Sequence, residues 1–182
     1  MGAKFTIEGT KLIHEGYVVR SEVLSVRTPE GDLVEREVAR HPGAVAVVAV
    51  HDDNIVLVSQ YRVALDSDLI EIPAGKRDIA GEDPEIAAKR ELVEEVGLET
   101  DELVQLGTFV TAAGFCDEQI IIYATTTCRK VPRRVEGPEE AHSEVVGVPV
   151  AEIGSWLTDG RITDAKTLIG LFWAREQGVV SW

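Results

Sequence analysis

Runs of apolar and β-branched residues alternate with turn-forming residues along most of the chain. The segment from Ala44 to Val50 is almost entirely apolar, which is typical of a strand buried on both faces. Asp52, Asp53 and Asn54 then form a predicted turn, and a second strand returns from Ile55 to Arg62. The same pattern predicts later strands at 104–111, 119–126 and 145–148.

The first forty residues form a smaller region of the same kind. Short strands are predicted from about Lys11 to Val38, with a turn from Pro29 to Asp32. Neither a repeat nor a linker divides the rest of the chain. We therefore predict N-terminal antiparallel strands in residues 1–40, acting as a dimerisation region, and one main domain in residues 41–182.

Two segments have the residues that begin and end helices. In the first, from Pro84 to Val96, Asp83 is the predicted N-cap, Pro84 occupies the first helical position and Gly97 ends the helix. The second segment runs from about Asp164 to Gln177. Helices combined with a set of strands predict an α/β (α+β) sandwich with a mixed sheet.

On a helical wheel at about 100° per residue, the first helix separates into an apolar arc and a charged arc. The apolar arc, expected to face the core, holds Ile86, Ala88, Leu92, Val93 and Val96. The opposite arc holds Arg90, Glu91, Glu94 and Glu95. Like charges at this spacing cost an isolated helix roughly 0.2–0.5 kcal/mol per pair, whereas a hard divalent cation would turn that repulsion into attraction. From helix geometry alone, a solvated charged face and a metal site are about equally plausible.

The composition of the chain indicates which partners and which cellular compartment to expect. The chain has 182 residues, 45% of them apolar, and a formal net charge of −14, which opposes binding to nucleic acid and to anionic membranes. We therefore expect neither nucleic acid nor membrane as a partner. The two cysteines form no CxxC pair, and the N-terminus has no apolar core of a signal peptide, so a reducing cytoplasm is the expected compartment.

The sequence around the charged arc resembles the Nudix box, G-x5-E-x7-R-E-U-x-E-E-x-G-U, in which U is apolar. Nine fixed positions of that pattern are matched, from Gly75 through Glu82 and Arg90 to Leu98. The one departure is a sixth residue between Gly75 and Glu82, in the loop before the helix. The resemblance implies a Nudix-type α/β/α sandwich and a hydrolase that depends on Mg²⁺, with Mn²⁺ as a possible substitute.

The resemblance also assigns roles within the box. Glu91 and Glu95 are implied as the principal metal ligands and Glu94 as an auxiliary ligand, with the carbonyl of Ala74 completing the set. Arg90 and Glu82 are implied to orient these carboxylates.

Three further segments resemble the ADP-ribose pyrophosphatase branch of the family: 60–62, 71–75 and 113–118. In that branch Arg62 would contact the diphosphate, although an ion pair with an acidic neighbour is nearly as plausible. Gly114 would allow close backbone approach to a ribose, and Glu118 would accept hydrogen bonds from ribose hydroxyls or bind a further cation. Glu37 would contact the adenine edge, the alternative being an exposed strand residue without a role. Ala113 stands where the branch usually has proline.

The late segment Gly137 to His142 has the composition and position of the loop that supplies a general base. We favour Glu140 as the base and Glu139 second, the alternative being two solvated surface glutamates. The implied substrate is a small nucleotide, ADP-ribose, cleaved to AMP and ribose 5-phosphate in a homodimer. The alternatives are another nucleoside diphosphate sugar, a Nudix-fold sensor without catalysis, and a Cys116 nucleophile paired with His142.

Overall fold

The computed structural model describes residues 4–135 and 137–182, and the side chains of residues 138 and 139 lie outside the described part. The chain divides into two compact units. The N-terminal unit contains residues 4–43 together with 110–119, and the core unit contains residues 44–109 and 120–182.

The N-terminal unit is built on a three-stranded antiparallel sheet in the order β1-β2-β3. Its strands are β1 (Thr6–Glu15), β2 (Arg20–Arg27) and β3 (Leu33–Arg40), so the predicted strand region is present and begins earlier than expected. Almost every residue of β1 is exposed, whereas Leu24 of β2 is buried. The segment 110–119 joins this unit through two backbone hydrogen bonds: the Ala39 amide donates to the Phe115 carbonyl at 2.7 Å and the Asp117 amide donates to the Ala39 carbonyl at 3.3 Å.

The core unit is organised around a seven-stranded mixed sheet. Five strands follow one another in the order β12 (Glu144–Pro149), β5 (Asn54–Arg62), β4 (Ala44–His51), β10 (Gln119–Thr125) and β9 (Val104–Val110). Strand β6 (Ser67–Glu71) pairs with β5, and β7 (Ala74–Lys76) pairs with β4. The β4–β10 pair is parallel, whereas β5 runs antiparallel to β4, β6 and β12.

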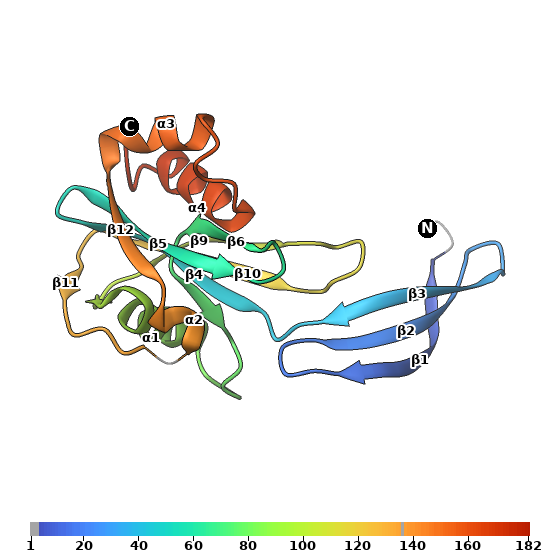
Figure 1. Cartoon of the computed structure of the whole chain (residues 1–182). Helices are drawn as coiled ribbons and strands as arrows, with labels where there is room; N and C mark the ends of the chain where they lie inside the picture. The colour runs from blue at the N-terminus through green and yellow to red at the C-terminus, as the bar shows by residue number, and fades with distance from the viewer. Residues whose placement is uncertain (1–3, 136) are drawn as a thin grey trace. The chain divides into compact units, whose positions relative to one another are not determined.

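Helices cover both faces of this sheet, as the core unit in Figure 1 shows. Side chains alternate along β4, so Val45 and Val47 pack with α1 (Pro84–Val96) on one face. Ala46 and Val48 pack on the other face with buried residues of α3 (Ile153–Thr158) and α4 (Ala165–Glu176). Burial on both faces explains why β4 is a continuous apolar run. The predicted α/β/α sandwich with a mixed sheet is confirmed.

The elements missing from the sequence prediction are short. Besides β6, β7 and α3 they are β8 (Leu98–Glu99), β11 (Arg129–Lys130), α2 (Pro138–Ala141) and the 3₁₀ turn Val150–Glu152. Such short elements have too few positions to display a clear period, although the six-residue β12 was predicted at 145–148. Over the described ranges, no helix combines the length and the hydropathy that crossing a membrane requires.

Helix α1 begins and ends where its capping residues predict. The Asp83 side chain accepts a hydrogen bond from the Glu85 amide, and Gly97 adopts a left-handed conformation with φ of 64°. The helical wheel placed Ile86 on the apolar arc that faces the core, and this prediction is wrong: Ile86 is 60% exposed, while its neighbour Ala87 is 1% exposed. The three glutamates of the charged arc are also buried, since α1 packs against β7 as well as against β4, β5 and β8.

Candidate active site

Three carboxylates of α1 lie in the interior of the core unit: Glu91, Glu94 and Glu95 are only 8%, 7% and 5% exposed. The backbone of β7 lies directly against two of them. The Glu95 Oε2 atom accepts a hydrogen bond from the Ala74 amide at 2.8 Å. A Cβ atom built on Gly75 would lie 1.8 Å from the Glu91 carboxyl carbon. The glycine that opens the Nudix box is therefore required because the Glu91 carboxylate fills the space beside it.

Arg90 connects the acidic residues of the box. Its Nε and Nη2 atoms donate to the two oxygens of Glu82, both at 3.1 Å. Its Nη1 atom donates to Glu91 at 2.7 Å and to Glu94 at 2.8 Å. The structure thus brings Glu82 and Arg90 together with two of the carboxylates that they were predicted to orient.

The electrostatics of this cluster favour the binding of positive charge. Burial raises the pKa of Glu91 to about 7, against the opposing effect of Arg90, and the charges of Glu94 and Glu140 raise it further. Burial likewise raises the pKa of Glu95 to about 7, with Glu91 and Glu140 adding to the shift and the Ala74 amide opposing it. Carboxylates held together in a poorly solvated site are stabilised in their ionised form by a cation.

The donor chemistry fits Mg²⁺, which prefers carboxylate and carbonyl oxygens. Within the described residues, no three His, Cys, Asp or Glu side chains are grouped so as to hold a metal ion. Glu91 and Glu94 instead each direct an oxygen to Arg90. The residues that would hold the ion are Glu91 and Glu95, with Glu94 and the Ala74 carbonyl, and this ligand set stays a prediction.

Arg62, at the end of β5, forms the ion pair that was the alternative to a diphosphate contact. Its Nε and Nη2 atoms each lie 2.6 Å from an oxygen of Glu71, which is buried. Lys166 of α4 donates to the same carboxylate and to Asp164. Burial raises the pKa of Glu71, but Arg62 and Lys166 outweigh that effect and hold it below its usual value. The Nη1 atom of Arg62 takes no part in the pair, so a diphosphate contact through it stays a prediction.

The predicted base segment lies in the core unit at α2. Glu140 is partly buried, and its charge acts on both Glu91 and Glu95. The side chain of Glu139, the second candidate, lies outside the described residues.

The other three predicted substrate contacts belong to the N-terminal unit. Glu37 is an exposed residue of β3, opposite Val23 in the register. Gly114 has open space where a Cβ atom would lie. Glu118 accepts a hydrogen bond from Thr111 at 2.8 Å and lies 3.3 Å from the His41 ring. Because each unit is described by itself, the contribution of these three residues to the substrate site stays a prediction.

Three residues support the site in roles that the sequence did not predict, although one of them, Glu71, lies in the resembling segment 71–75. They are Glu71 and Lys166, which hold Arg62, and Arg133, which contacts both α1 and the segment carrying Glu140. The partners named here lie 7 to 95 positions away in the chain, and no periodic pattern of the sequence connects them. The sequence carried one signal for Arg133: the last turn of α1 contains no basic residue to offset the partial negative charge of its carbonyl groups.

Known proteins resemble this chain in sequence and in fold. A family model described as the NUDIX domain matches residues 40–170. The chain is 39% identical to the methanol dehydrogenase activator of Bacillus methanolicus, covering 89% of this chain and 88% of the relative. It is also 39% identical to an ADP-ribose pyrophosphatase of Mycobacterium tuberculosis, covering 92% and 81%. A crystal structure of an ADP compounds hydrolase superposes with a TM-score of 0.82 at 26% identity, covering 97% of each chain.

Proposed function

The chain belongs to the Nudix family and is a Nudix hydrolase, and we propose that it uses Mg²⁺ to hydrolyse the diphosphate of ADP-ribose to AMP and ribose 5-phosphate. One observation carries the proposal: Glu91 and Glu95 are buried together against the 74–75 backbone, with pKa values raised to about 7. Burial destabilises their ionised form, which a bound cation would stabilise, and this supports a metal-dependent hydrolase over a binding module without catalysis.

Each side chain of the site then has a defined task. Glu91 and Glu95 hold the ion, while Arg90 keeps Glu91 and Glu94 oriented. Arg62, fixed by Glu71, binds the diphosphate through its remaining nitrogen. Glu140 takes the proton of the attacking water, a contribution typically worth about 10²–10⁴-fold. Bound Mg²⁺ supplies the positive charge that stabilises the negative charge developing on the diphosphate.

Substrate choice rests on the relatives together with the site. The activator and the pyrophosphatase are equally similar to this chain in identity, so that percentage alone does not select an activity. The intact set of box carboxylates supports hydrolysis, and the name of the pyrophosphatase supports ADP-ribose. Ala113, in place of proline, leaves the backbone before Gly114 with more conformational freedom, which we expect to raise KM rather than abolish activity.

A substrate panel tests the proposal. With Mg²⁺ present, ADP-ribose should give a higher kcat/KM than ADP-glucose, GDP-mannose or any nucleoside triphosphate, and chromatography should show AMP and ribose 5-phosphate as products. EDTA should stop turnover and iodoacetamide should not, because a Cys116 nucleophile would give the reverse. Preference for a hexose derivative would contradict the substrate assignment and leave the family unchanged.

We further propose a homodimer in which the N-terminal unit contacts a second copy of the chain. The large apolar side chains exposed on and beside β1 are Phe5, Ile7, Leu12, Ile13 and Tyr17. A three-stranded sheet with so little burial is only marginally stable alone, and exposed apolar patches mark interaction surfaces. In this arrangement Arg36 and Glu37 of one chain lie near Arg62 of the other. Both cysteines are free thiols, which supports the cytoplasm as the compartment.

A further inference from the structure

Arg133 contacts two segments that the mechanism needs to keep together. Its Nε atom donates to the Glu94 carbonyl of α1 at 3.3 Å. Its Nη2 atom donates to the Glu140 carbonyl at 3.1 Å and to the Ser143 hydroxyl, and its Nη1 atom donates to the Ser143 carbonyl at 3.3 Å. A single guanidinium therefore joins the helix of the metal ligands to the turn that contains the candidate base.

The backbone that carries Arg133 is itself fixed to the end of α1. Strand β11 pairs with β8, directly after the helix, and the Val131 amide donates to the Gly97 carbonyl at 2.9 Å. A Cβ atom on Gly97 would lie 2.8 Å from the Val131 carbonyl oxygen, so only glycine allows this close approach. The backbone position of Arg133 is thus fixed by the residues that end α1.

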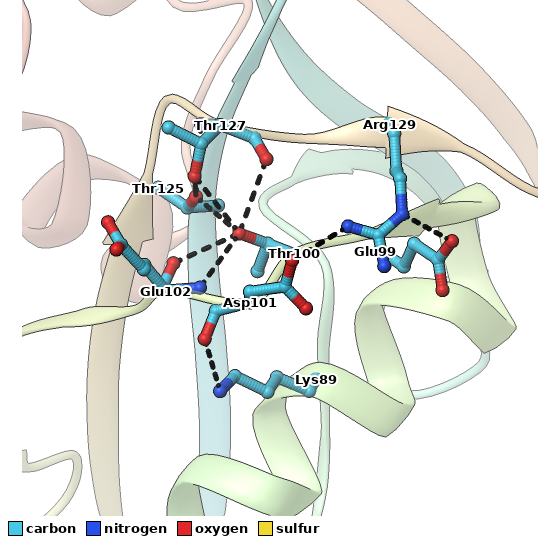
Figure 2. Close-up of polar contacts among 8 residues, drawn as sticks. All are labelled: Lys89, Glu99, Thr100, Asp101, Glu102, Thr125, Thr127 and Arg129. Carbon is cyan, nitrogen blue, oxygen red and sulfur yellow. Dashed lines mark hydrogen bonds and ion pairs between the residues drawn. The ribbon is translucent and has the colours of Figure 1, made fainter.

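Ion pairs and hydrogen bonds reinforce this pairing of strands, as Figure 2 shows. Arg129 of β11 donates to Glu99 of β8 at 2.7 Å and to Asp101 at 2.9 Å. Lys89, on α1, donates to the Asp101 carbonyl at 2.8 Å. The Thr100 hydroxyl lies 3.0 Å from the hydroxyl of Thr125 on the central sheet. Helix, β8–β11 ladder and sheet therefore form one connected support for Arg133.

The last turn of α1 also needs the cation that Arg133 provides. The final carbonyl groups of a helix have no partners within the helix and carry partial negative charge. The last turn of α1 contains no basic side chain, and the Glu94 carbonyl is one of these groups. Arg133 supplies the missing donor from outside the helix, in the place where a lysine or arginine of the helix itself usually acts.

At its other end Arg133 closes a tight turn. The Glu140 carbonyl accepts hydrogen bonds from the Ser143 amide at 3.1 Å, from the Ser143 hydroxyl at 3.0 Å and from Arg133. Ser143 is itself buried. With its carbonyl held by three donors, Glu140 has a fixed backbone position, from which its charge acts on Glu91 and Glu95.

We propose that Arg133 is a positioning residue for the general base: it clamps the 140–143 turn to α1, the helix of the proposed metal ligands, and so keeps Glu140 near Glu91 and Glu95. The proposal rests on the proposed function, in which Glu140 accepts the proton of the attacking water. Arg133 acts through Glu140 and touches neither substrate nor metal. Its loss should therefore lower kcat and leave KM largely unchanged.

Kinetics of Arg133→Gln test the proposal. Misplacing a base by about 1 Å costs roughly 10²-fold, so kcat for ADP-ribose should fall by about that factor. Arg133→Lys should recover only part of the lost kcat, because a single ammonium group cannot make all the contacts that the three guanidinium nitrogens make. The exposed neighbour supplies the matched control, and Arg134→Gln should behave as the wild type. If Arg133→Gln turns over at the wild-type rate, the clamp is wrong.

A double variant separates positioning from a general structural effect. If Arg133 acts through Glu140, then Arg133→Gln/Glu140→Gln should be no slower than Glu140→Gln alone, to within about twofold. Losses that multiply would overturn the proposal. Ser143→Ala, which removes one of the contacts with the Arg133 guanidinium, should lower kcat in the same direction by less. This milder variant keeps the test decisive if Arg133→Gln does not fold.

Amide hydrogen exchange tests the clamp without any assay of activity. The Ala141 amide donates to the Gly137 carbonyl at 2.9 Å and the Ser143 amide to the Glu140 carbonyl. Both amides should exchange faster in Arg133→Gln, while those within α1 keep their protection. Unchanged exchange at both amides would overturn the clamp even if turnover fell. A wild type that does not hydrolyse ADP-ribose would contradict the proposed function, and exchange would still decide the clamp.

Discussion

At the scale of single residues, the site depends on the absence of a side chain at Gly75. The Glu91 carboxylate occupies the place where a side chain would begin, so the box glycine is a steric requirement of the carboxylate that we propose as a metal ligand. Sequence reasoning found Gly75 from the motif alone. Its physical reason is a contact between residues sixteen positions apart, and a linear pattern does not reveal that contact.

Gly75→Ala should lower activity far more than stability. The atom displaced is the end of a flexible side chain, so the backbone can remain in place while the Glu91 carboxylate moves. We expect kcat/KM to fall by about 10²-fold or more, with a melting temperature close to that of the wild type. Gly147→Ala, whose Cβ atom would meet Asn54 at an ordinary 3.6 Å, is the control and should change neither quantity. Equal activity of the two variants would contradict the steric account.

Glu71 should make a contribution to stability that depends on pH. Its folded-state pKa lies below the unfolded value, so the stabilisation is complete above the usual carboxyl pKa and is lost as the pH falls through the folded pKa. At pH 7, Glu71→Gln should lower the free energy of unfolding by about 3 kcal/mol, the lower end of the range for a broken buried ion pair. The loss is at the lower end because Arg62 is partly exposed and Lys166 still pairs with Asp164.

Urea unfolding of the wild type and of Glu71→Gln across a pH series measures the difference in their free energies of unfolding. The gap in unfolding free energy should be constant near neutral pH and shrink below about pH 4.5, where the unfolded carboxyl group takes up its proton. A gap that widens towards acid would contradict the assignment of the ion pair.

At the scale of elements, local signals predicted most of the long elements and missed most of the short ones. Helix α1 was predicted residue for residue, because a cap, a proline and a terminal glycine act within the segment itself. Strand β7, only three residues long, was missed although it places Ala74 and Gly75 against the carboxylates. The burial of Glu94 and Glu95 was also missed, since a wheel shows which residues share an arc and not what covers that arc.

At the scale of the whole molecule, the N-terminal unit exposes large apolar side chains on and beside β1, and we propose that a second chain covers them. Light scattering at micromolar concentration should give the mass of two chains, and a monomer would contradict the proposed dimer. A mixture of Glu37→Ala and Glu95→Gln subunits tests the shared site. Each variant should be poorly active alone, while heterodimers retain one intact site and regain activity. No recovery would confine each site to one chain.

The central claim is that the buried carboxylates of α1 hold the catalytic Mg²⁺, and Glu95→Gln tests it most directly. Gln keeps an oxygen that can accept from the Ala74 amide and removes one charge from a crowded acidic site. The melting temperature without metal should therefore be no lower than that of the wild type. The deciding measurement is the initial rate of ADP-ribose hydrolysis at saturating Mg²⁺. We predict a rate at background for Glu95→Gln, whereas a rate near that of the wild type would contradict the metal site.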